Sequence, residues 1–308
     1  MEFIASCVKG LEFVTEKDTN GKKVIDGKVL FEKECEVRGA FYTYELLKKF
    51  KFKDLEDIQE KSRIDFKIKG KFKVECKREG EHEFNSKDVE NAIGEIIEGE
   101  VDLKNPDTVI FVDIEDDYIF LGKNIKKYKR DYKVRTNADS ISGQVAYCLL
   151  KVANIKEKSK ILDPLCKDGT LLLEAYEMGC KDLTGLNEDI KNVNVNCKIR
   201  KADIKLECGS LDWIDTKFKA KEFEFIITKL HAISKRKGET LIKSLIKEFL
   251  HQSDYVLKDD GEITVLMQRD ELFKEILKEF KFEIVDEFEF KTGVGFKILK
   301  LKKLIVKS

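Results

Sequence analysis

The stretch from residue 160 to residue 176, KILDPLCKDGTLLLEAY, holds the side chains best suited to binding a ligand. Its apolar start predicts the end of a buried strand, which Asp163-Pro164 terminates. A polar loop with one glycine follows, and a helix begins near residue 171, with Glu174 in a first turn that favours carboxylates. A strand, loop and helix in this order present backbone N–H groups to an anionic ligand. The alternative is an ordinary turn, because one glycine is a weak signal.

A histidine at the end of a later strand is a second candidate for chemistry. Residues 223–228 are predicted to form a strand, and Lys229 and His231 follow it. In an open α/β sheet the ligand-binding groups gather at the carboxyl ends of the strands. His231 could act there as a base, since its ordinary pKa lies near neutrality.

Two basic segments could contact the phosphates of a nucleic acid. Residues 61–78 contain eight basic and two acidic residues, with apolar residues and lysines alternating as in a strand with one buried face. Residues 123–135 contain seven basic residues and one acidic residue, with two tyrosines between them that suit base stacking. The candidate contact residues are Lys69, Lys71, Lys73, Lys77, Arg78, Lys126, Lys127, Lys129 and Arg130. The alternatives are a solvated strand face that lysines protect from edge pairing, and a charged linker.

Composition limits the classes of protein that fit. The 308 residues can form two or three domains, and 59 basic residues balance 59 acidic ones, so no overall field attracts nucleic acid. Abundant lysine and glutamate with scarce glutamine are typical of a thermophile. Without a secretory signal or a long apolar run, we expect a soluble, cytoplasmic protein with no membrane partner. The eight cysteines form no C-x-x-C pair and have no flanking histidine, so we expect no metal.

Strands and helices must alternate to position these residues. In the second half we expect helices over 139–153, 241–252 and 272–280, strands ending near 162, 188, 228 and 267, and closing antiparallel strands over 283–290 and 295–300. This order predicts a mostly parallel sheet. Residues 1–50 are predicted to be mixed α/β with a helix over 42–50, and Ser86 is predicted to cap a helix from Lys87.

The segment from residue 72 to residue 114 resembles the THUMP domain. The similarity lies in FKVECKREGEHEFNSKDVENAIGEII at 72–97 and VDLKNPDTVIFVDI at 101–114. KGLEFVTEK at 9–17 is similar to the opening of the small ferredoxin-like domain that precedes THUMP in the same family. This resemblance implies that the protein binds structured RNA, usually tRNA, by its shape and acceptor end.

The loop DPLCKDGT at 163–170 resembles motif I, D-P-x-C-G-S-G-T, of the class I S-adenosylmethionine-dependent RNA methyltransferases that carry THUMP, such as the archaeal tRNA guanine methyltransferases. The resemblance implies an α/β chain with a ferredoxin-like part over 1–50, THUMP over 51–135, and a Rossmann-like methyltransferase domain over 136–308. That domain would have a mostly parallel sheet and an antiparallel closing strand. It also implies S-adenosylmethionine as cofactor, bound by Asp163, Pro164, Cys166, Gly169, Thr170, Asn187 and Ser210.

The chain departs from the family pattern at positions that would face ligands. Lys167 replaces a glycine, Asn187 and Ser210 replace acidic residues, and Lys229 to Ala232 replace N-P-P-Y, which makes Lys229 and His231 the catalytic candidates. We therefore predict an RNA-binding family member, with tRNA as ligand, whose transferase centre is eroded or atypical. The alternatives are an active methyltransferase for the exocyclic amine of guanine in tRNA, and a non-catalytic partner subunit of another RNA-modifying enzyme.

Overall fold

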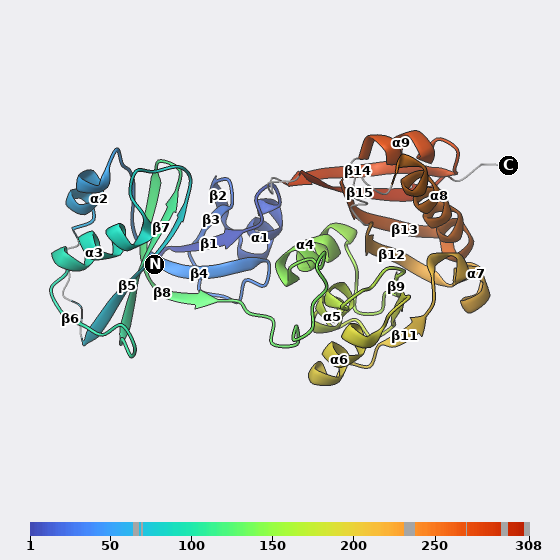
Figure 1. The fold of residues 1–308 in the computed structure, drawn as a ribbon, viewed down its shortest axis with the longest axis horizontal. Coiled ribbons are helices and arrows are strands. Elements are labelled where there is room, and N and C mark those ends of the chain that lie inside the picture. The colour runs from blue at the N-terminus through green and yellow to red at the C-terminus, as the bar shows by residue number, and fades with distance from the viewer. Residues whose placement is uncertain (64–67, 69, 231–237, 269, 291–294, 305–308) are drawn as a thin grey trace. The chain divides into compact units, whose positions relative to one another are not determined.

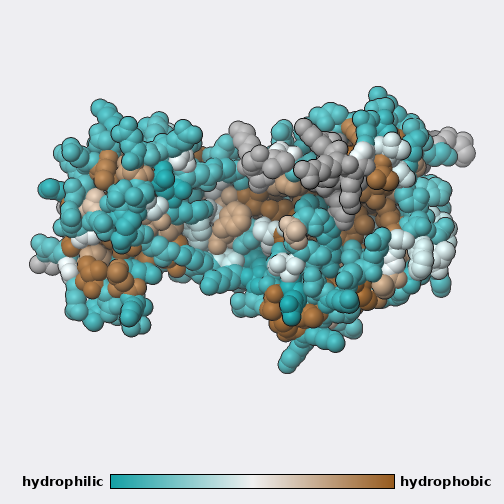
Figure 2. All heavy atoms as spheres, viewed as in Figure 1, coloured by the Kyte–Doolittle hydropathy of each residue, from teal (hydrophilic) through white to brown (hydrophobic). Residues whose placement is uncertain are grey.

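The computed structural model describes residues 1–63, 68, 70–230, 238–268, 270–290 and 295–304, which form two compact units (Figure 1). The first unit contains residues 1–7 and 15–128, and the second contains residues 8–14 and 129–308. Helix α1 (Glu12–Thr19) begins in the second unit and continues into the first, because the chain passes between the units after Val14. None of the helices in these ranges combines the length and apolar character needed to cross a membrane. In Figure 2, hydrophilic residues cover most of the visible surface.

The described strands of the first unit form a single sheet in the order β2-β3-β1-β4-β8-β7-β5-β6. They are β1 (Phe3–Cys7), β2 (Lys22–Ile25), β3 (Lys28–Phe31), β4 (Ala40–Lys51), β5 (Lys71–Glu79), β6 (Glu100–Val101), β7 (Thr108–Glu115) and β8 (Tyr118–Lys127). The β5 strand pairs in parallel with β6 and β7, and the other neighbours are antiparallel. Since β4 joins β1 to β8, the predicted ferredoxin-like and THUMP parts share this sheet. The boundaries at residues 50 and 135 stay predictions.

Helices α2 (Leu55–Lys61) and α3 (Ser86–Ile96) cover one face of this sheet. Ile58, Val89 and Ile93 pack there against residues of β7. The N-cap of α3 is Asn85, so the prediction that Ser86 caps it is wrong. The Asn85 side chain accepts hydrogen bonds from the N–H groups of Lys87 and Asp88 at 2.8 and 3.2 Å. The Asp88 carboxylate accepts from the Asn85 N–H, which completes a capping box.

The predicted helix over 42–50 is also wrong, because these residues form the middle of β4. Tyr42, Leu46 and Phe50 are four residues apart, a spacing that places side chains on one face of a helix but equally on one face of a strand. Antiparallel pairing with β1 on one side and β8 on the other satisfies the backbone as a strand. Aromatic residues also favour the pleated form.

A buried ion pair connects β3 to β7, which lie four strands apart in the sheet order. Lys28 and Asp113 are each 1% exposed, and the Lys28 Nζ lies 2.6 Å from the Asp113 carboxylate. Burial alone would lower the pKa of Lys28, but the charge and hydrogen bond of Asp113, together with Tyr42 and Glu115, outweigh it and the pKa rises. The hydroxyls of Tyr42 and Tyr44 donate to the same carboxylate at 3.1 Å. A contact across so many strands requires a strongly curled sheet.

The second unit is built on a sheet whose described strands follow the order β11-β10-β9-β12-β13-β15-β14. They are β9 (Ile161–Asp163), β10 (Leu183–Asn187), β11 (Lys205–Cys208), β12 (Phe223–Lys229), β13 (Leu257–Met267), β14 (Phe282–Phe290) and β15 (Phe296–Lys303). The first five in this order are parallel, whereas β15 is antiparallel to β13 and β14 to β15. The predicted parallel sheet with antiparallel closing strands is confirmed.

Helices cover both faces of this sheet (Figure 1). One face carries α4 (Gly143–Ala153), α5 (Thr170–Glu177) and α6 (Lys191–Arg200). The other carries the 3-10 turn Leu211–Trp213 with α7 (Ile214–Lys217), α8 (Glu239–Val256) and α9 (Asp270–Leu277). Ile161 and Leu162 show the alternation, since the first packs in one core and the second in the other. All the cysteines are free.

We predict that Lys28→Met destabilises the first unit by about 3–5 kcal/mol, because it leaves the Asp113 charge buried without its cation. Lys51→Met is the matched control. It removes an exposed pair with Asp117 at 2.7 Å, and should leave the free energy of unfolding close to that of the wild type, because water screens such a pair. Urea unfolding of both variants measures the difference. Equal losses in the two variants would contradict a structural role for the buried pair.

Candidate ligand site at the carboxyl edge of the second sheet

The carboxyl ends of β9, β10 and β12 lie side by side because these strands are parallel neighbours. Leu162 pairs with Ile226 of β12 and also with Thr184 of β10. In the sheet, β9 lies between β10, the next strand along the chain, and β12, which comes later in the sequence. Open α/β sheets bind ligands at such a switch point, where helices on the two faces diverge. The loop after β9 contains the predicted motif.

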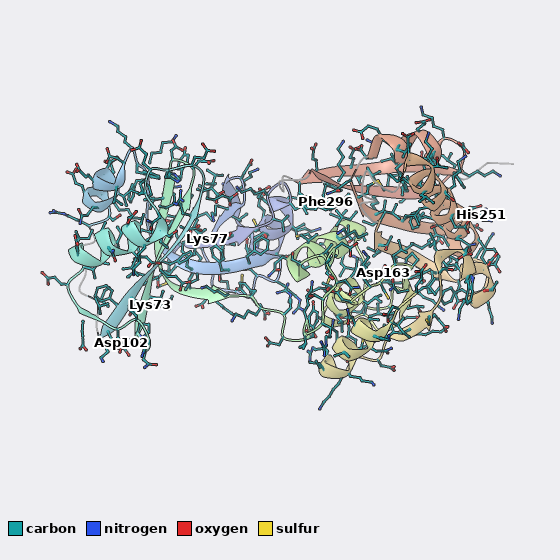
Figure 3. The ribbon with its side chains drawn as sticks, in the orientation of Figure 1. Lys73, Lys77, Asp102, Asp163, His251 and Phe296 are labelled. Atoms are coloured by element: carbon teal, nitrogen blue, oxygen red, sulfur yellow. The ribbon has the colours of Figure 1, made fainter. Side chains whose placement is uncertain are left out.

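Asp163 is the last residue of β9 and is 4% exposed. Its Oδ1 accepts hydrogen bonds from the Thr228 hydroxyl at 2.7 Å and from the Leu165 N–H at 3.2 Å. Burial raises the pKa of Asp163 to about 7, although these two donors oppose the shift. Figure 3 places this residue inside the second unit. None of the described residues contributes a cation that stabilises the charged form of this carboxyl group.

The loop between β9 and α5 keeps the backbone shape of a glycine-containing turn. Lys167 has φ of 49° and Gly169 has φ of 77°, both in the left-handed region that strains side chains other than glycine. A Cβ on Gly169 would lie 2.5 Å from the Val193 side chain, so the close packing of α6 requires this glycine. Asp168 accepts from the N–H and hydroxyl of Thr170 at 3.2 and 2.8 Å. Its second carboxylate oxygen is buried without a hydrogen bond, 3.7 Å from the Lys133 Nζ.

Two lysines at this edge converge on Asp139, which precedes α4. The Lys167 ammonium pairs with the Asp139 carboxylate, and the Lys229 Nζ donates to the Asp139 carbonyl at 2.6 Å. Burial and then the Lys229 charge lower the pKa of Lys167 to about 8. Burial also lowers the pKa of Lys229, whose Nζ lies 5.3 Å from the centre of the Phe296 ring. The edge therefore carries closely spaced cations.

The segment that enters the second unit is held by a buried carboxylate on α5. Glu174, which is 0% exposed, accepts from the Arg130 Nε at 2.7 Å and from the Tyr132 hydroxyl. The interpretation of Glu174 as a first-turn charge is wrong, because it is the fifth residue of α5 and its partner is Arg130. The Arg130 side chain is 8% exposed, so this pairing, and not RNA contact, is the role that the structure gives it.

The remaining predicted cofactor residues lie at the same edge but differ in what they offer. Pro164 and Cys166 are buried, and burial raises the pKa of the Cys166 thiol well above its usual value. Asn187 ends β10, and its amide donates to the Asp189 carbonyl at 2.9 Å. The Ser210 hydroxyl donates to Asp212. His231 lies outside the described residues, and the binding roles stay predictions.

The remaining predicted RNA contacts that the structure describes lie on β5 and β8 of the first unit, except Lys129, which begins the second unit. Lys71, Lys73 and Lys77 alternate with apolar residues along β5, as predicted, and Figure 3 shows the last two. Burial, followed by the Lys28 charge, lowers the pKa of Lys77. Lys127 pairs with Glu75. The other candidates are Arg78, which donates to the Gly80 carbonyl at 3.1 Å, Lys126, whose Nζ lies 5.3 Å from the Tyr128 ring centre, and exposed Lys129; Lys69 lies outside the described residues.

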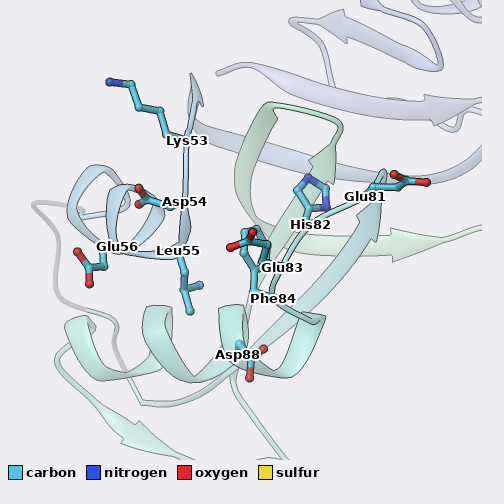
Figure 4. Close-up of a pocket in the computed structure, with 9 residues that line it drawn as sticks. All are labelled: Lys53, Asp54, Leu55, Glu56, Glu81, His82, Glu83, Phe84 and Asp88. Carbon is cyan, nitrogen blue, oxygen red and sulfur yellow. The ribbon is translucent and has the colours of Figure 1, made fainter.

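A cavity of about 960 Å³ opens in the first unit between α2 and the start of α3 (Figure 4). Its lining contains the carboxylates of Asp54, Glu56, Glu81, Glu83 and Asp88, and the cation of Lys53. Such a lining repels phosphate, so this cavity does not suit the backbone of a nucleic acid. Within the described ranges, no three His, Cys, Asp or Glu side chains are grouped to hold a metal ion.

Several residues of the edge were missed by sequence reasoning. Asp139 and Asp168 are ordinary acidic residues in loops, and only their contacts with lysines reveal them. Phe296 comes from the antiparallel strand β15, whose register with β13 places it at this edge. A weak signal existed for Asp168, since it lies within the motif at 163–170. No sequence signal connected Phe296 with Lys229.

Two family models match the chain. The model for the THUMP domain matches residues 46–123, and the model described as "RMKL-like, methyltransferase domain" matches residues 130–297. The second match covers more than half of the chain. These assignments agree with the resemblances found at 72–114 and 163–170.

Curated relatives include three enzymes named tRNA (guanine(6)-N2)-methyltransferase, from Thermus thermophilus, Archaeoglobus fulgidus and Methanocaldococcus jannaschii. The enzyme of Thermus thermophilus is 35% identical over 34% of this chain and 33% of its own length. The enzyme of Methanocaldococcus jannaschii is 23% identical over 72% of this chain and 73% of its own. The chain thus matches about a third of the length of the Thermus thermophilus enzyme and nearly three quarters of that of the Methanocaldococcus jannaschii enzyme. The crystal structure of TrmN from Thermus thermophilus has a TM-score of 0.79 at 21% identity, covering 98% of this chain and 99% of that one, which shows a shared fold.

We predict that Asp163→Asn removes a pH-dependent loss of stability. The pKa is 3.8 ordinarily and about 7 in the fold, so between these values the unfolded chain releases a proton that the folded chain keeps. Stability from this group is therefore full below pH 4 and falls as the pH rises to 7, by at most about 4 kcal/mol. Thermal melting from pH 4 to pH 8 should show a smaller decline for the variant. Asp203→Asn, at an exposed position, should retain the wild-type decline.

Proposed function

Because the chain belongs to the RMKL-like methyltransferase family and carries a THUMP domain, we propose that it binds structured RNA of the tRNA class without transferring a methyl group. The lysine-bearing face of β5, with Lys126, Lys127 and Lys129, would contact the phosphates. The division of the chain into a ferredoxin-like part over 1–50, THUMP over 51–135 and the transferase domain over 136–308 belongs to this proposal.

The single observation that carries this proposal is that Lys167 and Lys229 both contact Asp139, the first through its carboxylate and the second through its carbonyl. Lys167 occupies a backbone conformation suited to glycine, and the family has a glycine there. Lys229 stands where the family has an asparagine that would accept a hydrogen bond from the target amine. An ammonium group can only donate, so it cannot replace that acceptor.

S-adenosylmethionine is the methyl donor that the family implies, and it carries an ammonium cation, a sulfonium cation and a carboxylate, so its net charge is positive. Asp163 suits an ammonium group, because a cation beside it would relieve the cost of its buried charge. One of the ammonium groups of Lys167 and Lys229 could pair with the donor's carboxylate, but together they place two positive charges beside a ligand whose net charge is positive. The two lysines therefore weaken the fit to the donor.

The second candidate function is methyl transfer from S-adenosylmethionine to the exocyclic amine of a guanine in tRNA. The names of these three curated relatives favour it. Asp163, Gly169 and Thr170 also keep the family's motif I residues. A labelled methyl group transferred to a tRNA transcript would establish this candidate and end the first.

We predict that the full chain binds a tRNA transcript and that Lys73→Gln/Lys77→Gln weakens the affinity about threefold to tenfold. Each lost phosphate contact should reduce the slope of log affinity against log salt by about 1. Fluorescence anisotropy at several salt concentrations measures both. Lys17→Gln, at an exposed site outside the predicted surface, is the control and should match the wild type. A wild-type protein that does not bind the transcript at low salt would contradict the proposal.

We predict that S-adenosylmethionine gives no heat of binding with the wild type, and that Lys167→Gly/Lys229→Asn gains measurable binding. The glycine fits the φ of 49° and removes one cation, and the asparagine removes the other. Isothermal titration calorimetry tests both proteins. Micromolar binding by the wild type would overturn the account of these lysines.

A further inference from the structure

We propose that Lys133, Lys167, Lys229 and Phe296 form a nucleotide site at the carboxyl edge of the second sheet. The three ammonium groups would take a phosphate of the bound RNA, and the Phe296 ring would stack on a base. This inference rests on the proposed RNA-binding function. It assigns RNA binding to the carboxyl edge of the second sheet, where the chain departs from the family pattern.

The strand register places the Phe296 ring at the same edge as Lys229. Lys229, the last residue of β12, pairs with Leu266 of β13, and Leu266 pairs with Ile298 of β15. Phe296 lies two residues before Ile298, so it lies at the same edge as Lys229. The Phe290 ring supports it from β14, with the ring centroids 5.7 Å apart and the planes within 11°. Figure 3 shows Phe296 at the start of its strand.

The lysines bring more positive charge than the carboxylates around them can balance. Three ammonium groups face the carboxylates of Asp139 and Asp168, while Asp163 is held partly neutral by burial. The Glu174 carboxylate also acts on Lys133, but Arg130 pairs with it and balances its charge. Burial lowers the pKa of all three lysines, and the Lys229 charge adds to the effect on Lys167. A phosphate would reverse these shifts, because an anion stabilises the charged form of each lysine. The Lys229 ammonium, with three N–H groups, has donors beyond the one given to Asp139.

The combination of cations and an aromatic ring favours a nucleotide over a simple anion. Proteins that bind single-stranded nucleic acid stack bases on aromatic side chains and track the phosphates with lysine and arginine. Lys229 already lies over the Phe296 ring, so one nucleotide could contact both. A carboxylate or inorganic phosphate would use the lysines and leave the ring without a role. A variant without the Phe296 ring therefore distinguishes a nucleotide site from a site for a simple anion.

The experiment measures binding of a tRNA transcript to the full chain by fluorescence anisotropy, comparing the wild type with Lys229→Gln, Lys167→Gly and Phe296→Leu. We expect each variant to bind threefold to tenfold more weakly. The salt slope should fall by about 1 for each lysine variant and stay unchanged for Phe296→Leu. Lys167→Gly retains the positive φ that the loop needs, so its folding is protected. A loss with the lysines alone would overturn the base-stacking part.

Lys181→Gln is the matched control. Its Nζ lies 4.7 Å from the Tyr176 ring centre, so it repeats the cation–aromatic pair just before β10, at the amino end of the strand. It should bind like the wild type, and thermal melting should show that all variants are folded. Wild-type affinity in folded Lys229→Gln and Phe296→Leu would overturn the site, whereas a wild type without affinity would overturn the proposed function itself.

Discussion

The carboxylate of Glu174 is the constraint on which the second unit depends. It is removed from water in the middle of α5, and such a charge is stable only when donors surround it. Arg130 and Tyr132 supply those donors, which fixes the incoming chain against the helix. Asn196 continues the attachment by accepting from the N–H of Arg135 and donating to the Asp168 carbonyl, at 2.9 and 2.8 Å. The loop after β9 is thereby held from both sides, and the positions of Lys133 and Lys167 follow.

Much of the second sheet follows from local sequence patterns. Short apolar runs with turn residues after them gave β9, β12 and β13, and the loop of 163–170 was found as a turn between strand and helix. The partner of the two lysines could not be found in this way. Asp139 lies 28 residues before Lys167 and 90 before Lys229, and only the folded sheet brings them together. Phe296 depends on the register of an antiparallel strand, which composition does not encode.

The basic segment at 123–135 shows where charge patterning misleads. A run of cations was interpreted as a surface, yet Arg130 is buried against a carboxylate 44 residues away in the sequence. Tyr128 and Tyr132 are 8% and 4% exposed, so neither ring is open to a base. Amphipathic side chains bury their apolar bodies when a distant polar partner satisfies the polar end. The segment is thus partly a structural joint, while Lys126, Lys127 and Lys129 remain at the surface.

The link from β3 to β7 has a consequence for dissecting the protein. Asp113 receives its cation from Lys28 and two hydroxyl groups from Tyr42 and Tyr44, all of which precede residue 51. A fragment that starts at residue 51 would keep this acid in its apolar surroundings with every one of those three donors gone. It would also lose β4, against which β8 pairs. Division of the chain at residue 51 would therefore separate the remaining strands of the first unit from the groups that satisfy Asp113 and from the strand that pairs with β8.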